Sequence, residues 1–199
     1  MKTLLLIDLQ NDFMPGGALA VSGGDEIIPI VNDLMPQFDL IVATQDWHPA
    51  DHGSFAANHP GKSVHDQIVL DGLTQTLWPV HCVQNTGGAL FAPDLDTRRI
   101  TRVFTKGMDP RIDSYSGFYD NGHRASTGIG EWLKAQNVSE LTMAGVATDY
   151  CVKFTVLDAL KEGFRVNLIA QACRGVNLQP GDLARALDEM QAAGAVILH

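Results

Sequence analysis

Apolar residues along this chain form two alternating patterns. Short, nearly continuous aliphatic runs are typical of parallel strands that are buried on both faces. Five such runs cover residues 2–8, 40–46, 102–106, 141–145 and 165–170. A last strand is predicted over residues 195–198. Because helical segments separate the runs, the pattern predicts a single α/β domain over residues 1–199, with a doubly wound, mostly parallel sheet and helices on both faces.

Two segments between these runs repeat apolar residues at the three- and four-residue spacing of an amphipathic helix. The repeating positions are Ile27, Val31, Leu34 and Met35 in the first segment, and Leu183, Leu187 and Met190 in the second. Asp182 is a candidate N-cap of the second helix, and Gly194 lies just beyond its end. Residues 49–88 show neither period. An irregular stretch of that length is uncommon unless it is functional, so we expect it to form part of a site.

Composition and charge narrow the class of protein. The 199 residues are 45% hydrophobic and 19% charged, which is ordinary for a globular domain. A net charge of -9 without a Lys/Arg cluster argues against a nucleic-acid partner. The first apolar run stops at Asp8, too early for a signal peptide or a membrane span. Cys82, Cys151 and Cys173 are odd in number and form no CxxC pair, so we expect free thiols and a cytoplasmic protein.

Reactive side chains follow the predicted strands at their carboxyl ends, which is the edge where open parallel sheets bind ligands. The first strand ends at Asp8, the second leads to Asp46 and His48, the third ends at Lys106, and the fourth leads to Cys151. Each of these residues alone has an ordinary structural explanation. Their common location at one edge of the sheet is what indicates a site.

Cys151 stands before an apolar helix predicted over Val152–Leu160, with Thr148 or Asp149 as its N-cap. In the first turn of a helix, the dipole and free N–H groups stabilise a thiolate and lower the pKa of the thiol. The N–H groups from Ala147 to Cys151 also suit a developing oxyanion. A buried structural cysteine is the competing interpretation.

Asp8 follows four aliphatic residues, so its carboxylate is expected to be partly desolvated, which favours the protonated form. Such a group acts as a general base toward a thiol when a nearby cation balances it, and Lys106 supplies that cation. A turn-forming aspartate and an exposed lysine are the competing interpretations.

Asp46 and His48 are two residues apart and point the same way in an extended chain. His81 would complete a site of one carboxylate and two imidazoles, which suits one divalent zinc or iron ion, with manganese also possible. His52 is the best candidate for a fourth contact, and the sequence leaves that contact open. Scattered surface histidines are the competing interpretation.

Six segments together resemble the isochorismatase-like cysteine hydrolase family, in particular its nicotinamidase branch, over essentially the whole chain. They are DLQNDF at residues 8–13, QDWHP at 45–49, WPVHCV at 78–83, KG at 106–107, DSYSGF at 113–118 and GVATDYCV at 145–152. Their order and separation are far more specific than any single motif.

The resemblance implies a fold, an activity and a set of site residues. The activity is hydrolysis of nicotinamide to nicotinate and ammonia through a thioester, with a metal ion that positions the pyridine ring. The implied residues are a triad of Asp8, Lys106 and Cys151, metal ligands Asp46, His48 and His81, an oxyanion hole at Ala147 and Cys151, a non-proline cis peptide at Val146–Ala147, and a ring pocket of Phe13, Trp78, Tyr115 and Val146.

Other functions are compatible with parts of this pattern. A sister amidase acting on a ureido or N-carbamoyl compound would share the triad but generally lack the metal ligands, and isochorismatases proper lack the nucleophilic cysteine. A non-catalytic metal-binding or thiol-sensing protein would need neither Asp8 nor Lys106. The sequence leaves open the metal, the preference between nicotinamide and pyrazinamide, and whether the chain forms a homo-oligomer.

Overall fold

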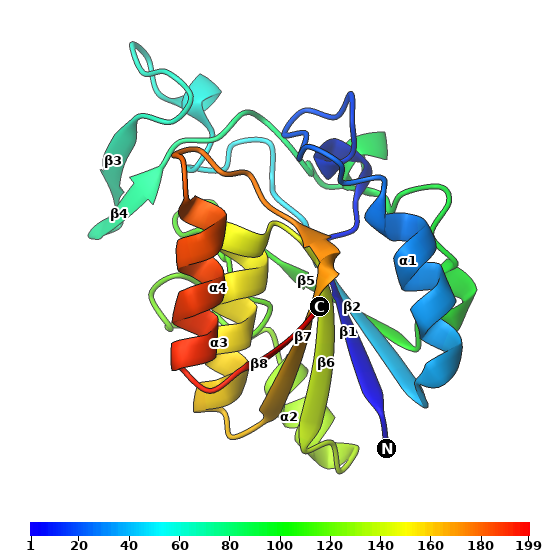
Figure 1. Cartoon of the computed structure of the whole chain (residues 1–199). Helices are drawn as coiled ribbons and strands as arrows, with labels where there is room; N and C mark the ends of the chain where they lie inside the picture. The colour runs from blue at the N-terminus through cyan, green and yellow to red at the C-terminus, as the bar shows by residue number, and fades with distance from the viewer.

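A six-stranded parallel sheet forms the centre of the computed structural model, which describes all 199 residues (Figure 1). The strand order is β5-β2-β1-β6-β7-β8, and every neighbouring pair is parallel. The strands are β1 Thr3–Ile7, β2 Leu40–Asp46, β5 Arg102–Lys106, β6 Glu140–Val146, β7 Arg165–Arg174 and β8 Val196–Leu198. The predicted doubly wound α/β fold is confirmed, and all six predicted strands are present.

Four α-helices cover the two faces of the sheet. They are α1 Ile27–Leu34, α2 Ile129–Ala135, α3 Lys153–Lys161 and α4 Asp182–Ala192. Alternate residues of β1 face opposite ways: Leu4 and Leu6 pack in one core cluster with residues of α1, whereas Leu5 and Ile7 pack in the other with residues of α2, α3 and α4. None of the helices is long and apolar enough to cross a membrane.

Short helical turns fill many of the connections. Those of the 3-10 type are Asn11–Phe13, Met35–Gln37, Ala56–Asn58, Gly87–Ala89 and Thr97–Arg99, and the turn at Thr148–Val152 is a π-helix. The stretch 49–88 is less irregular than predicted, because it contains a hairpin of β3 Gln67–Leu70 and β4 Leu73–Thr76. Asp71 and Gly72 form its turn with positive φ values of 46° and 84°, so the Asp-Gly pair was the signal that the hydrophobic pattern missed.

Two further details differ from the sequence-based expectations. The α2 helix was not predicted, because its seven residues are too few for a clear helical period. Asp182 is the first residue of α4 rather than its N-cap, which is Gly181 in the left-handed region. The Asp182 carboxylate instead accepts a hydrogen bond from the backbone N–H of Gln179. Gly194 lies beyond the helix end with a φ of 112°, as predicted.

Candidate functional site

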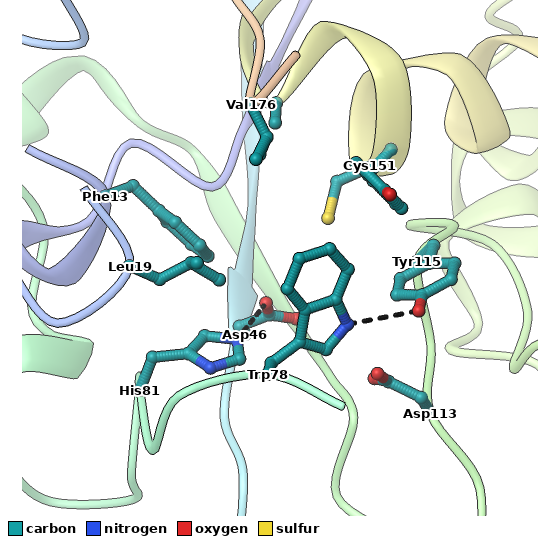
Figure 2. A pocket seen from close by; sticks show the side chains of 11 residues that line it. Phe13, Leu19, Asp46, Trp78, His81, Asp113, Tyr115, Cys151 and Val176 are labelled. Carbon is teal, nitrogen blue, oxygen red and sulfur yellow. Dashed lines mark hydrogen bonds and ion pairs between the residues drawn. The ribbon is translucent and has the colours of Figure 1, made fainter. Parts of the chain in front are cut away.

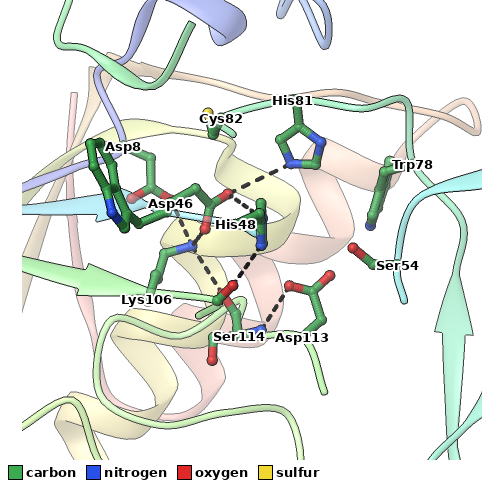
Figure 3. Close-up of polar contacts among 12 residues, drawn as sticks. Asp8, Asp46, His48, Ser54, Trp78, His81, Cys82, Lys106, Asp113 and Ser114 are labelled. Carbon is green, nitrogen blue, oxygen red and sulfur yellow. Dashed lines mark hydrogen bonds and ion pairs between the residues drawn. The ribbon is translucent and has the colours of Figure 1, made fainter. Parts of the chain in front are cut away.

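Three charged side chains meet at the carboxyl edge of the sheet (Figure 3). Asp8 follows β1, Asp46 ends β2 and Lys106 ends β5, and β2 lies between the other two strands. Lys106 Nζ lies 2.9 Å from Asp8 Oδ2 and also contacts Asp46 Oδ1. The remaining oxygen of Asp8 accepts a hydrogen bond from Thr44 Oγ1 at 2.6 Å. The two carboxylates thus share one buried cation.

Cys151 completes this group from the turn between β6 and α3. Its Sγ lies 3.4 Å from Lys106 Nζ, and the same nitrogen donates to the backbone carbonyl of Ser114 at 3.0 Å. The structure therefore brings together Asp8, Lys106 and Cys151. However, Cys151 lies in the π-turn Thr148–Val152 that precedes α3, not in the first turn of the α-helix.

The predicted N-cap at Thr148 or Asp149 is wrong, because neither side chain caps the helix. The Asp149 carboxylate accepts hydrogen bonds from the backbone N–H groups of Val176 at 2.9 Å and Asn177 at 2.6 Å. This contact fixes the loop after β7 against the turn that carries Cys151.

Burial dominates the electrostatics of the triad. Desolvation raises the pKa of Asp8 above its usual range although Lys106 opposes the change, as the sequence predicted. Burial opposes the charge on Lys106, yet the carboxylates of Asp46 and Asp8 keep the pKa of this ammonium well above its ordinary value. Burial also raises the pKa of the Cys151 thiol well above its usual range, against the pull of Lys106. The expectation of a lowered thiol pKa is wrong for the free protein, so the thiol needs a base.

A second group lies on the far side of Asp46. Its Oδ2 atom is 3.6 Å from His48 Nε2 and 3.7 Å from His81 Nε2. The Nδ1 atoms of both rings contact backbone carbonyls, at 2.8 Å from Gly107 for His48 and 2.7 Å from Pro79 for His81. Because a carbonyl only accepts, Nδ1 carries the proton in each neutral ring, and the Nε2 lone pairs face the carboxylate.

Three acceptor atoms that converge in this way repel one another unless a proton or a metal cation lies between them. One ligand atom from each of Asp46, His48 and His81 lies within 4.8 Å of the other two, and all three residues are buried. Hydrogen bonds from Nδ1 to carbonyls are the usual way in which proteins orient metal-binding histidines. The donor set therefore fits a divalent metal ion with open coordination positions.

Gln10 holds the backbone of Asp46 at the junction of the two groups. Its Oε1 accepts from the Asp46 N–H at 2.8 Å, and its Nε2 donates to the carbonyls of Asp46 at 2.8 Å and Ala89 at 2.9 Å. Sequence reasoning missed this residue, although it lies within the first motif, because an amide contact to a strand 36 residues away leaves no local pattern.

A small cavity opens between the two groups (Figure 2). Its walls are mostly apolar, and they include the Sγ-bearing side chain of Cys151 and two of the metal-site residues. The lining residues are Phe13, Leu19, Asp46, Trp78, His81, Asp113, Tyr115, Ala147, Tyr150, Cys151 and Val176. A cavity of this kind suits a small, flat molecule with a few polar groups.

The predicted aromatic residues are all in this wall, and Trp78 Nε1 donates to the Tyr115 hydroxyl at 3.1 Å. Val146 is not among the lining residues, and its side chain is fully buried in a core cluster, so the cavity does not support the prediction that Val146 binds substrate. Ala147 takes that place, and the Val146–Ala147 peptide bond is cis, as the resemblance implies.

Four other lining residues, Leu19, Asp113, Tyr150 and Val176, were not predicted. Asp113 and Tyr150 lie within matching motifs, which was the one available signal. Leu19 and Val176 come from connecting loops with no periodic pattern.

Fold and site together define a hydrolase with a doubly wound α/β fold, in which a cysteine adjoins a buried acid–lysine pair and a cluster that fits a divalent metal ion. The chain belongs to the isochorismatase family, because residues 2–199 match its isochorismatase domain. It is 52% identical to the nicotinamidase of Escherichia coli over 98% of this chain and 93% of that protein. The structure of an Acinetobacter baumannii nicotinamidase/pyrazinamidase is similar, with a TM-score of 0.96 and 45% sequence identity. The match covers 100% of this chain and 95% of that chain. A Pyrococcus horikoshii pyrazinamidase solved in complex with zinc matches with a TM-score of 0.81 and 40% sequence identity, over 100% of this chain and 98% of that chain.

Proposed function

We propose that this chain is an enzyme that hydrolyses nicotinamide to nicotinate and ammonia, with residues 1–199 acting as one catalytic domain. The observation that carries the proposal is the cavity that has the thiol of Cys151 in one wall and the metal-site residues Asp46 and His81 in another. The high identity to proteins named nicotinamidases supports nicotinamide as the substrate.

In the proposed first step, Asp8 accepts the proton of the Cys151 thiol, and the sulfur attacks the carboxamide carbon. The raised pKa of Asp8 makes it a competent base for this transfer. Lys106 contacts both groups and balances the negative charge that they share. We assign the oxyanion to the backbone N–H groups of Ala147 and Cys151; one such donor is typically worth about 3 kcal/mol.

Asp8 then returns its proton to the departing ammonia, which leaves a nicotinoyl thioester on Cys151. Water deprotonated by Asp8 hydrolyses the thioester, and the proton goes back to the sulfur as the C–S bond breaks. We place the ring between Phe13, Trp78 and Tyr115, which line the cavity and whose faces and edges suit a flat aromatic group.

Asp46, His48 and His81 would hold the divalent metal ion. When bound, the ion supplies a coordination position for the pyridine nitrogen, which fixes the ring relative to Cys151. We infer zinc or iron, with manganese less favoured, because a carboxylate and two imidazoles suit these ions. The zinc in the Pyrococcus horikoshii relative supports this choice.

Release of ammonia from nicotinamide by the metal-loaded protein is the direct test of this function.

We expect benzamide, which lacks the ring nitrogen, to be a much poorer substrate, and pyrazinamide to be accepted because it keeps a nitrogen in the same place. Chelation should weaken both turnover and substrate affinity. Equal kinetics for benzamide and nicotinamide would refute the role of the metal, and no release from metal-loaded protein would refute the substrate.

A glycine beside His48 offers a test of the metal site. Gly107 has a φ of 68°, and a Cβ atom added there would lie 2.4 Å from His48 Cε1. We expect Gly107→Ala to displace the imidazole and weaken metal binding by at least about tenfold, the lower range for disturbed ligand orientation. The measurement is metal affinity by competition with a chromogenic chelator.

Gly61→Ala is the matched control for this change. Gly61 has a similar φ of 79°, but a Cβ atom there would meet nothing within 4 Å. Both variants carry a similar backbone strain, of roughly 1–2 kcal/mol, so only Gly107→Ala should lose metal. The same metal affinity in both variants would contradict the assignment of His48.

A further inference from the structure

Thr44 carries a buried hydroxyl group beside the proposed triad, and the mechanism above gives it no role. The residue lies on β2, is fully buried and does not line the cavity. A buried hydroxyl is costly unless it forms a hydrogen bond. The partner of Thr44 Oγ1 is Asp8 Oδ1, at 2.6 Å. Because an ionised carboxylate only accepts, the hydroxyl donates, and one oxygen of the base is occupied.

The two oxygens of the Asp8 carboxylate therefore differ. Oδ1 accepts from Thr44, whereas Oδ2 lies 2.9 Å from Lys106 Nζ in an ion pair without hydrogen-bond geometry. The same nitrogen lies 3.4 Å from Cys151 Sγ, and an oxygen of Asp8 lies within 4.8 Å of that sulfur. The oxygen with a free lone pair is thus the one on the side of Lys106 and the thiol.

The backbone alone does not fix the direction of this carboxylate. The β1 strand ends at Ile7, and Asp8 has a positive φ of 51°, so its side chain does not continue the alternation of the strand. The last torsion of an aspartate side chain is broad and roughly two-fold, so the carboxylate turns easily when nothing holds it. A hydrogen bond from the neighbouring strand supplies the restraint that β1 does not.

The side chain of Thr44 is itself held by packing. A β-branched residue has few χ1 rotamers. Gly117 packs so closely against its methyl group that a Cβ atom added to Gly117 would lie 2.8 Å from Thr44 Cγ2. The N–H of Gly117 in turn donates to Thr155 Oγ1 at 2.9 Å, which fixes this stretch of backbone. The methyl group of Thr44 therefore lies on the side of Gly117, and its hydroxyl is directed at Asp8.

We propose that Thr44 is a positioning residue for activation of the nucleophile: its hydroxyl occupies Oδ1 of Asp8 and holds the carboxylate so that Oδ2 takes the proton of the Cys151 thiol. The inference rests on the proposed function, because it concerns the base of that mechanism. Thr44 does not line the cavity, so it acts through Asp8. Loss of the hydroxyl should slow proton transfer and leave substrate binding nearly unchanged.

Three variants separate the hydroxyl from the rest of the side chain. Thr44→Val removes the hydroxyl and keeps the shape of the side chain, whereas Thr44→Ser keeps the hydroxyl. Thr3→Val is the matched control, because Thr3 is 2% exposed, lies at the other end of β1 from Asp8, and has an Oγ1 atom without a hydrogen-bond partner. Urea unfolding shows that each variant is folded before it is assayed.

Alkylation of Cys151 by iodoacetamide measures activation of the thiol without nicotinamide. The sulfur forms a bond to carbon and displaces iodide, while its proton passes to Asp8. We expect Thr44→Val to slow this reaction by roughly 10- to 100-fold, the cost of a small misplacement of a reacting group, and Thr44→Ser and Thr3→Val to react like wild type. Mass spectrometry of the Cys151 peptide separates this reaction from that of the other two cysteines, which do not line the cavity. Equal rates in Thr44→Val and wild type would overturn the inference, as would an equal loss in Thr44→Ser.

Steady-state kinetics with nicotinamide distinguish positioning from a loosened structure. We expect kcat of Thr44→Val to fall with little change in KM, whereas a distorted cavity would raise KM as well. Zinc affinity should equal that of wild type, although Thr44 is two residues from Asp46. A loss of zinc that accounts for the lost activity would overturn the inference.

A neutron structure of the wild-type protein tests the same arrangement without any variant. We expect a deuteron on Thr44 Oγ1 that points to Asp8 Oδ1, and a deuteron on Oδ1 itself would overturn the inference. The tests also separate the two proposals. Slower alkylation of Thr44→Val without ammonia release from nicotinamide by wild type would refute only the substrate, whereas ammonia release with equal kcat in wild type and Thr44→Val would refute only the role of Thr44.

Discussion

Replacement of Cys151 by alanine is expected to abolish ammonia release from nicotinamide, with kcat/KM falling by roughly 10⁴-fold or more, as when the nucleophile of a hydrolase is removed. The sulfur is the one nucleophile of the cavity wall that lies beside both a base and a cation. Steady-state kinetics of wild type and variant, each loaded with the same metal, measure the loss. Because the side chain is not a metal-site residue, metal affinity should stay unchanged.

Cys173→Ala is the control for loss of a buried thiol. Cys173 is buried like Cys151 but does not line the cavity, and burial raises its pKa to about 12. We expect this variant to lose some stability and to keep its turnover. If Cys151→Ala retained more than a few per cent of the wild-type activity, the thioester mechanism would be wrong.

Replacement of Lys106 by methionine is expected to remove activity and to lower the free energy of unfolding by about 3–5 kcal/mol, the usual cost of removing one partner of a buried ion pair. Lys106 is 2% exposed, and its ammonium contacts the carboxylates of both Asp8 and Asp46. Methionine fills much of the same volume but leaves two carboxylates without a cation. Urea unfolding of the metal-free protein measures the effect, since a bound ion would partly compensate Asp46.

The double variant Lys106→Met with Asp8→Asn separates the charge effect from the loss of packing. Removing one carboxylate relieves half of the uncompensated charge, so we expect the double variant to be more stable than Lys106→Met alone and still inactive. Equal stability of wild type and Lys106→Met would show that the lysine does not compensate the buried carboxylates.

The sequence by itself determined the strands and the edge at which the site lies. Continuous aliphatic runs are a local property, and a run such as that of β1 or β2 is stable only when both faces are covered. The residue at the end of such a run lies at the edge of the sheet, because the strand ends there. Asp8, Asp46 and Lys106 could therefore be assigned to one edge before their neighbours were known, and the motif order extended the assignment to Cys151.

Only the tertiary structure decided how these residues act on one another. Burial raises the pKa of the Cys151 thiol, whereas its place at the start of a helix was expected to lower it. Desolvation depends on segments that are distant in the chain, so the sequence does not show it. The wall residues Leu19 and Val176 come from loops whose positions no local period specifies. The Nδ1 atoms of His48 and His52 meet different partners, a backbone carbonyl for His48 and a backbone N–H for His52, a difference that two identical residue types do not encode in sequence.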